Sequence, residues 1–198
     1  GFLDETPICP ICSGQGYVGS TMCECLQELC RQEQKKQISV LVSGDQHFED
    51  FRLEYYSDKL DPKFGASPRF IMEKTLKACY AFAADFVPGC GNLLLSGNTG
   101  LGKTFLSACI ARYVADNGFS VVYDTVSKLI SDFEATRFGS DRTDLTRKYF
   151  ECDLLIFDDL GTELTNQFTL SCLYNIINTR IIMHKSTIIN TNLSDKEL

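Results

Sequence analysis

The sequence predicts an α/β fold in which a mostly parallel sheet lies between two layers of helices. Short apolar runs of strand length alternate with longer segments whose apolar residues recur at helical spacing. A glycine-rich segment follows the first of these runs, and a pair of aspartates ends a later one. In a parallel sheet the ligand site lies at the carboxyl ends of the strands, and both features fall there.

The chain from residue 67 onward supplies the elements of this core. Ser67 is the predicted N-cap of the first helix and Pro68 its first residue, since serine accepts a bond from a helical N–H. Apolar runs predict strands at residues 92–96, 119–123, 154–159 and 187–189. Helical spacing predicts helices at residues 67–87, 102–116, 126–138 and 168–184, with a polar helix ending at Phe150. The residues expected to face inward on the last helix are Leu173, Ile176, Ile177 and Ile181.

The glycine-rich segment 97–104, GNTGLGKT, fits the phosphate-loop pattern G-x-x-x-x-G-K-[ST] at every fixed position. Glycines let backbone N–H groups turn toward phosphate oxygens, and the following helix adds its positive end. We expect Lys103 to reach the β- and γ-phosphates and Thr104 to coordinate Mg²⁺. The predicted nucleotide-binding residues are Gly97, Asn98, Thr99, Gly100, Leu101, Gly102, Lys103, Thr104 and Phe105. The alternative is a glycine-rich turn before a core helix.

Two carboxylates end the apolar run LLIFDD. We expect Asp158 to hold Mg²⁺ through water, facing Thr104, and Asp159 to orient the water that attacks the γ-phosphate. Lys103 and Asp159 are therefore candidate catalytic residues. A buried strand that enters an acidic turn would show the same pattern, because Leu160 and Gly161 follow.

Four cysteines near the N-terminus form the pattern C-x2-C-x10-C-x-C, at Cys9, Cys12, Cys23 and Cys25. Four thiolates on two short turns suit tetrahedral Zn²⁺ with no open position, which is a structural site. Cys30 is an alternative fourth ligand. Reduced, unliganded cysteines or a redox pair would also fit the spacing.

The segment between the cysteines and the core is less informative. Residues 26–41 read as a polar helix that serves as a solvated connector. The aromatic residues between His47 and Tyr56 are equally consistent with an adenine pocket and with core packing, and His47 reads as structural.

Composition narrows the class of protein. At 198 residues the chain is long enough for one domain with an appendage or for two small domains. The net charge of −7 argues against a dominant non-specific electrostatic grip on DNA. No apolar run approaches the ~18 residues of a membrane span, and residues 1–7 carry no signal-peptide pattern, so we expect a cytoplasmic protein.

Three segments, GNTGLGKT, LLIFDDLG with Glu163, and STIINTNLS, together resemble the AAA+ helicase loaders of bacteria, of the DnaC/DnaI type. IstB-like transposition-helper ATPases are close relatives of that group. The stretch FEDFRLEYYSD and the cysteine segment are similar to loaders of Gram-positive bacteria. The sequence ends before the fifth strand, arginine finger and sensor 2 of that family, and Arg180 is not expected to replace the finger.

The resemblance implies roles that spacing alone does not. Asn192 matches the sensor-1 position, which makes it a third candidate catalytic residue. Implied DNA contacts are Lys128, Phe133, Arg137 and Phe138, although the charge pattern of residues 127–148 by itself favours a solvated face. The implied cofactors are ATP or ADP, Mg²⁺ and structural Zn²⁺. The implied partners are the replicative hexameric helicase, single-stranded DNA and, on ATP binding, further copies of the chain, with no membrane.

Three domains follow from this resemblance: a helicase-docking zinc knuckle at 1–30, a linker and adenine-pocket segment at 31–66, and an incomplete ATPase core at 67–198. The predicted activity is weak ATP hydrolysis used to load the helicase. Rival hypotheses are a transposase-helper ATPase, a phosphotransferase and an adaptor that does not hydrolyse nucleotide. The zinc knuckle argues against the first, and the lack of an arginine-rich lid in 125–150 argues against the second.

Overall fold

Four parallel strands form the centre of the structure, a computed structural model that describes residues 9–42, 46–138, 144–161 and 167–193. The strands are β3 (Leu93–Ser96), β4 (Val121–Thr125), β5 (Leu154–Leu160) and β6 (Ser186–Thr191). Their order across the sheet is β3-β6-β5-β4, and every neighbouring pair is parallel. The predicted α/β class with a parallel sheet is confirmed.

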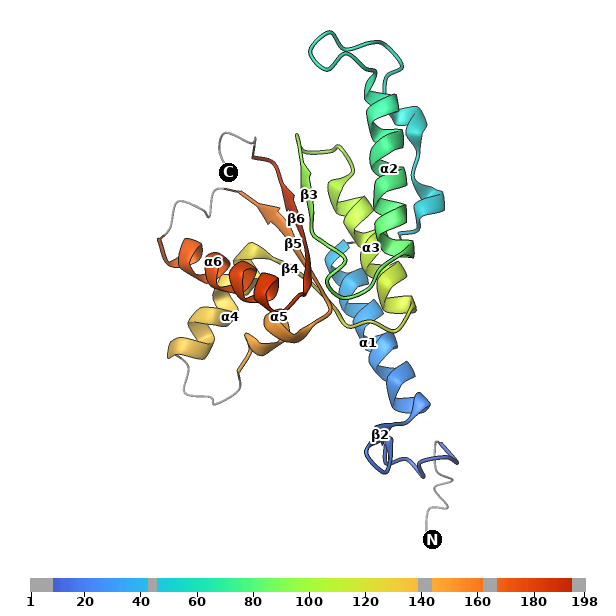
Figure 1. The fold of residues 1–198 in the computed structure, drawn as a ribbon, viewed down its shortest axis with the longest axis vertical. Coiled ribbons are helices and arrows are strands. Elements are labelled where there is room, and N and C mark those ends of the chain that lie inside the picture. The colour runs from blue at the N-terminus through green and yellow to red at the C-terminus, as the bar shows by residue number, and fades with distance from the viewer. Residues whose placement is uncertain (1–8, 43–45, 139–143, 162–166, 194–198) are drawn as a thin grey trace.

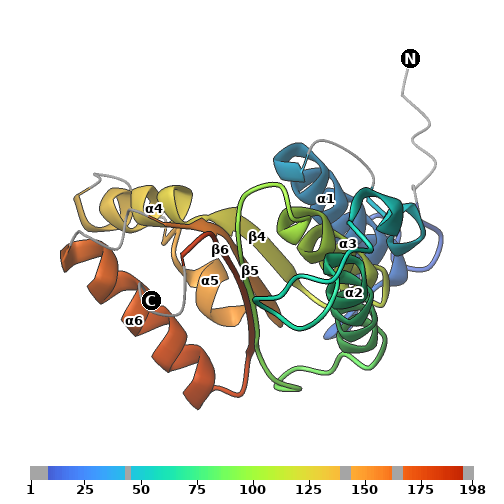
Figure 2. The same ribbon diagram turned by 90° about the horizontal axis from the view of Figure 1, so that it is seen from above.

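Helices cover both faces of this sheet (Figures 1 and 2). One layer holds α1 (Glu24–Val42), α2 (Pro68–Ala84) and α3 (Lys103–Asp116). The other holds α4 (Val126–Phe138), α5 (Arg147–Glu151) and α6 (Gln167–Ile182). Two 3₁₀ turns, Phe48–Asp50 and Leu53–Tyr55, precede α2, and a hairpin of β1 (Tyr17–Val18) and β2 (Thr21–Met22) precedes α1.

Most local predictions agree with these bounds. The Ser67 hydroxyl caps α2 by accepting a bond from the Phe70 N–H at 3.3 Å. The strand predicted at 119–123 is shifted, however, and begins at Val121. Ser120 donates two hydrogen bonds to the Asp153 carboxylate, from its N–H at 3.0 Å and from its hydroxyl at 2.8 Å. Ser120 therefore belongs to the turn that precedes β4. The polar helix predicted to end at Phe150 is short, and residues 139–143 lie outside the described structure.

The interpretation of residues 26–41 as a solvated connector is wrong. Helix α1 lies beside α3 and β4 over part of its length, so it belongs to the layers of the core (Figure 1). Its polar sequence does not predict this contact.

Strand β5 is buried on both faces, as expected for a central parallel strand. Leu154 and Ile156 join the apolar cluster under α2 and α3, while Leu155 and Phe157 join the cluster under α4 and α6. All four side chains are at most 1% exposed. Strand β5 therefore contributes fully buried side chains to both halves of the core.

The inward-facing position near the end of α6 is occupied by Arg180, which is fully buried, while the neighbouring Ile181 is 55% exposed. The prediction that Ile181 faces inward is therefore wrong. The guanidinium donates to the carbonyl oxygens of Tyr149 at 2.9 Å, Cys152 at 3.0 Å and Ser186 at 2.5 Å. Carbonyl groups that converge from three elements thus make a cation acceptable at this position.

Replacement of Arg180 should destabilise the fold strongly, whereas replacement of Ile181 should not. Arg180→Met leaves several buried carbonyl groups without donors, at about 1–3 kcal/mol each, so we expect a loss of at least about 3 kcal/mol in the free energy of unfolding. Ile181→Ala should change it by about 0.5 kcal/mol or less. Urea unfolding of the two variants measures the difference, and a larger loss for Ile181→Ala would contradict this interpretation of α6.

Candidate functional site

The phosphate loop connects β3 to α3 and has the backbone that its glycines permit. Gly97, Gly100 and Gly102 have φ values of 140°, 83° and 87°, a region that disfavours other residues. Gly102 is also crowded, because a Cβ there would lie 3.0 Å from the Tyr56 hydroxyl oxygen. The loop therefore needs glycine for conformation at three positions and for space at one of them.

Lys103 begins α3, and its ammonium group points back over the loop. Nζ donates to the carbonyl oxygens of Gly97 at 2.6 Å and Asn98 at 3.0 Å, and to Asn192 Oδ1 at 2.7 Å. Burial lowers the pKa of Lys103, and the carboxylates of Asp158 and Asp159 act in the opposite direction. The Lys103 ammonium group, which would bind the phosphates, is thus held next to the loop backbone.

The carboxyl ends of β5 and β6 bring the other predicted residues to the same edge of the sheet. The Thr104 hydroxyl donates to Asp158 Oδ1 at 3.2 Å, and Asn192 Nδ2 donates to Asp159 Oδ1 at 3.2 Å. A register shift in β5 between Phe157 and Leu160 gives Asp159 a φ of 58°. The two adjacent carboxylates consequently have different neighbours, Thr104 for one and Asn192 for the other.

The oxygen atoms of Thr104 and Asp158 are the kind of ligand that Mg²⁺ takes in nucleotide sites. The two side chains approach each other within hydrogen-bond distance, and Asp158 is only partly buried. This pair therefore fits a magnesium ion that is shared with nucleotide phosphates.

Sequence patterns missed three residues that contact Asp158 or its donors, namely Ser107, Tyr123 and Asn190. The Tyr123 hydroxyl donates to Asp158 Oδ2 at 2.8 Å, and Asn190 Nδ2 donates to Oδ1 at 2.9 Å. A hydropathy pattern counts Tyr123 as an apolar strand residue and cannot show where its hydroxyl points. The polar end of the run IINTN was the only signal for Asn190.

The aromatic segment before α2 lies against the phosphate loop. The Tyr56 hydroxyl donates to the Leu101 carbonyl oxygen at 3.1 Å, and its ring stacks on Phe51 with 5.8 Å between centroids. Phe51 also contacts Phe105 of α3, at 5.7 Å between centroids, and packs on the core with Phe48. Core packing of these residues is thus observed, and the adenine pocket stays a prediction.

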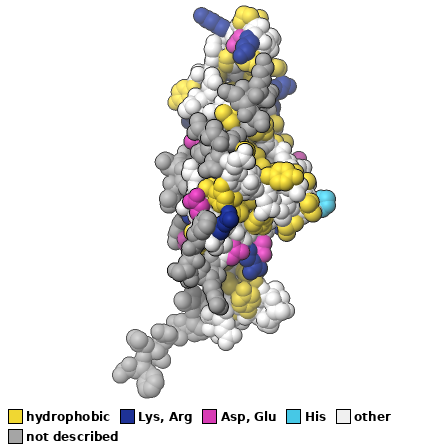
Figure 3. Space-filling model, turned by 90° about the vertical axis from the view of Figure 1, so that its left-hand side faces the viewer, with side chains coloured by type: hydrophobic (Ala, Val, Ile, Leu, Met, Phe, Trp, Pro, Cys, Tyr) yellow, Lys and Arg dark blue, Asp and Glu magenta, His cyan; other side chains and the backbone are white. Residues whose placement is uncertain are grey.

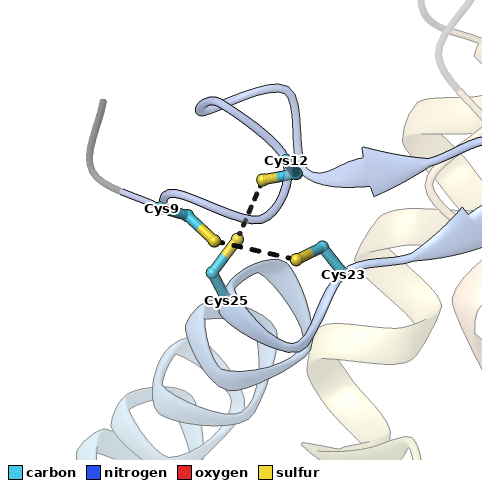
Figure 4. A group of neighbouring side chains, drawn as sticks. All are labelled: Cys9, Cys12, Cys23 and Cys25. Atoms are coloured by element: carbon cyan, nitrogen blue, oxygen red, sulfur yellow. Dashed lines mark hydrogen bonds between the residues drawn. The ribbon is translucent and has the colours of Figure 1, made fainter. Parts of the chain in front are cut away.

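The four predicted cysteines converge in the N-terminal module (Figure 4). Cys9 and Cys12 precede β1, Cys23 follows β2, and Cys25 lies in the first turn of α1. All four sulfur atoms lie within 4.8 Å of one another, with 3.8 Å from Cys9 to Cys23 and 3.4 Å from Cys12 to Cys25. Zn–S bonds of about 2.3 Å in a regular tetrahedron separate the sulfurs by about 3.8 Å. The cluster therefore fits a tetrahedral metal ion.

The fourth member of this cluster is Cys25, not the alternative Cys30, which is exposed and outside the group. Burial raises the pKa of the Cys12 thiol, but hydrogen bonds from the Cys25 thiol and the Gly16 N–H more than offset this and lower it to about 7. A thiolate at this position is the form that a metal ion requires.

The candidate DNA contacts lie on or near α4. Lys128 forms an ion pair with Asp132 while half of its side chain stays exposed. The Phe133 ring meets Phe150 edge-on, and the Arg137 guanidinium lies 6.0 Å from the Phe168 ring centroid. The side chain of Phe138 lies outside the described structure.

Phe133 and Arg137 line a cavity of about 470 Å³ between α4 and α6, together with Phe168 and Cys172. On this side of the molecule the described basic side chains are scattered, some of them beside acidic ones, and form no continuous basic patch (Figure 3). Among the described residues, no helix has both the length and the apolar character needed to cross a bilayer.

Comparison with known proteins places this site in a family. The family model described as IstB-like ATP binding protein matches residues 28–197. The replicative helicase loader DnaC of Buchnera aphidicola is 27% identical over 129 residues, covering 64% of this chain and 52% of that protein. A putative insertion sequence ATP-binding protein of Sinorhizobium fredii is 32% identical over 89 residues, covering 45% and 30%. The chain thus spans about half or less of these relatives.

Two solved structures share the fold. A DnaC helicase loader aligns with a TM-score of 0.58 at 24% identity, covering 74% of this chain and 79% of that one. A DnaI structure aligns with a TM-score of 0.60 at 21% identity, covering 82% and 79%. The family match covers most of the chain, including the phosphate loop and both aspartates, and the chain therefore belongs to the family of IstB-like ATP binding proteins.

Proposed function

We propose that this chain binds ATP with Mg²⁺, hydrolyses it slowly in isolation, and uses the nucleotide cycle to load a replicative hexameric helicase onto single-stranded DNA in the cytoplasm. The observation that carries this proposal is the convergence of Lys103, Thr104, Asp158, Asp159 and Asn192 at one edge of the sheet. A phosphate-binding cation, a magnesium pair and a carboxylate beside an amide are the groups that ATP hydrolysis requires.

Each group has a separate role in the proposed reaction. The loop N–H groups and Lys103 bind the phosphates, and Thr104 and Asp158 hold Mg²⁺, which when bound neutralises charge on the phosphate oxygens. Asp159 orients a water molecule that forms a bond to the γ-phosphorus while the bond to the ADP oxygen breaks, and the proton that the water loses passes to the released phosphate. Asn192 lies between Lys103 and Asp159, so it can contact both the γ-phosphate and this water.

The helicase-loading part of the proposal draws on the relatives and on the N-terminal module. DnaC of Buchnera aphidicola is a replicative helicase loader, and it matches 64% of this chain. The cysteine cluster precedes the family match and lies apart from the core at the far end of α1 (Figure 1). Its exposed apolar side chains include Ile11 and Val18, with exposed fractions of 67% and 52%. We propose that the module, residues 1–30, holds zinc and docks on the helicase.

The remaining assignments complete this proposal. Within the segment 31–66, the end of α1 packs beside α3 and β4, and the residues after it serve as linker and adenine pocket, with Tyr56 and Phe51 beside the loop. Residues 67–198 form the ATPase core, which self-associates on ATP binding. Single-stranded DNA contacts Lys128, Phe133, Arg137 and Phe138, with base stacking on an aromatic ring.

A transposase-helper ATPase is the second candidate. The observation that favours it is the match to the putative insertion sequence ATP-binding protein of Sinorhizobium fredii. The same nucleotide chemistry would serve there, and only the protein partner would differ.

Loading should depend on Lys103. With the replicative helicase of the same cell and circular single-stranded DNA, we expect ATP-dependent helicase assembly with the wild-type chain and none with Lys103→Ala, because the variant lacks the phosphate-binding cation. Lys77→Ala removes a lysine whose side chain is 68% exposed on α2 and should load normally. If the chain and the helicase never associate, the loader proposal is wrong, and the transposase of a neighbouring insertion sequence becomes the partner to test.

The N-terminal module should depend on a metal ion. We expect the purified chain to contain about one Zn²⁺, and Cys9→Ser to lose it and the helicase contact, because so small a module has little apolar core. Cys30→Ser is the matched control and should retain the metal. Metal content by mass spectrometry measures both variants. ATP binding should survive in each, since the cluster lies outside the core, and equal metal loss in both variants would argue against this ligand set.

A further inference from the structure

The Asp158 carboxylate is held from its buried side by two uncharged side chains. Tyr123 of β4 is 5% exposed and donates to Oδ2 at 2.8 Å. Asn190 of β6 is 1% exposed and donates to Oδ1 at 2.9 Å. Thr104 approaches Oδ1 from the side of the phosphate loop, at 3.2 Å. The strands that flank β5 therefore each supply one donor to this carboxylate.

Ser107 of α3 links the two donors. Its Oγ lies 3.0 Å from the Tyr123 hydroxyl oxygen and accepts a bond from Asn190 Nδ2 at 2.7 Å. Since the phenol has one proton and donates it to Asp158, the serine proton goes to the tyrosine oxygen or to the Thr104 carbonyl oxygen, 3.1 Å away. Every contact in this network thus orients a donor toward Asp158 or supports one that does.

Stability alone does not explain an asparagine at position 190. Both protons of Nδ2 are used on Asp158 and Ser107, whereas Oδ1 is buried without a hydrogen-bond partner in the described structure. A buried, unsatisfied acceptor costs about 1–3 kcal/mol, which an aliphatic residue would avoid. The advantage of asparagine at this position is its ability to donate to Asp158.

We infer that Tyr123 and Asn190 are positioning residues, which keep the Asp158 carboxylate turned toward Thr104 in the orientation that serves a nucleotide-bound Mg²⁺. This inference rests on the proposed function, because it assigns Asp158 to that ion. The phosphate loop itself, including Lys103, makes no hydrogen bond to either residue in the described structure. Loss of the two donors should therefore weaken the response to Mg²⁺ and leave metal-free nucleotide binding unchanged.

Tyr123→Phe tests this directly, because it removes one oxygen atom and keeps the ring. We would titrate a fluorescent ATP analogue with the full chain, first in excess EDTA and then across a range of Mg²⁺ concentrations. We expect unchanged affinity in EDTA and a rise of about 10-fold in the Mg²⁺ concentration that gives half of the Mg²⁺-dependent tightening, the size found when residues that orient metal ligands are lost.

Tyr149→Phe is the matched control. Tyr149 is also buried, and its hydroxyl oxygen lies within hydrogen-bond distance of two carboxylates in a separate cluster, Asp124 at 2.9 Å and Asp132 at 2.7 Å, which share its single proton. This variant should keep the wild-type Mg²⁺ requirement even if it loses stability. An equal rise for both variants would overturn the inference.

Asn190→Leu provides an independent readout, and it keeps the test open if Tyr123→Phe folds poorly. This variant removes the donor together with the unsatisfied acceptor, so the loss of that acceptor offsets part of the cost of the two lost hydrogen bonds, and we expect a folded variant with a raised Mg²⁺ requirement. The inference would be overturned, and the proposed function left standing, by either of two results: folded variants with an unchanged Mg²⁺ requirement, or variants that lose nucleotide affinity equally with and without Mg²⁺. Wild-type chain whose nucleotide affinity does not respond to Mg²⁺ would contradict the proposed function as well.

Discussion

The structure depends on parallel pairing of β5 with strands on both of its sides. Because the side chains from Leu154 to Phe157 are buried on both faces, the strand can be placed only in the middle of the sheet. Its register against β4 and β6 then fixes where it ends, opposite Thr125 and Thr191. The two aspartates emerge at that point, beside the start of α3. The geometry of the site is consequently a result of core packing as much as of the glycine loop.

The register shift at the end of β5 separates the roles of two adjacent carboxylates. Adjacent strand residues normally point to opposite faces, and a bulge re-aims side chains further. Here Asp158 turns toward Thr104 and the buried donors, whereas Asp159 is exposed and contacts Asn192. The Asp158 carboxylate is thus held in one orientation, as a metal ligand would need to be. The Asp159 carboxylate is accessible, as a group that orients water would need to be.

Both faces of the sheet combine an apolar cluster with buried polar groups. Under α2 and α3, the apolar cluster is joined beside the phosphate loop by the buried network of Ser107, Tyr123 and Asn190. The face under α4 and α6 contains buried polar groups as well, with Arg180 bound by carbonyl oxygens and Tyr149 bound by two carboxylates. Lys148 neutralises that second group through ion pairs with Asp124 and Asp132, at 2.8 and 3.2 Å. Burial raises the pKa of Asp132, but hydrogen bonds from Lys128, Tyr149 and Lys148 more than offset this and lower it.

The sequence by itself determined the features whose chemistry is local. The phosphate loop, the aspartates after an apolar run, the Ser67 cap and the cysteine spacing are each recognisable within a few residues, and all appear in the structure. The identity of the fourth cysteine of the cluster, Cys25 and not Cys30, could be read only from the tertiary structure. Five residues of helix separate the two by about 7.5 Å along the axis, and only the first turn of α1 reaches the other cysteines.

Only the tertiary structure showed the role of side chains whose neighbours come from distant segments of the chain. Arg180 faces inward because its guanidinium binds carbonyl groups from α5, from β6 and from the turn that precedes β5. A hydropathy pattern instead predicts that an arginine is exposed. Tyr123 and Asn190 matter because three strands bring them to Asp158. A sequence pattern records the polarity of each residue, but hydrogen-bond partners at buried sites are set by the packing of the whole sheet.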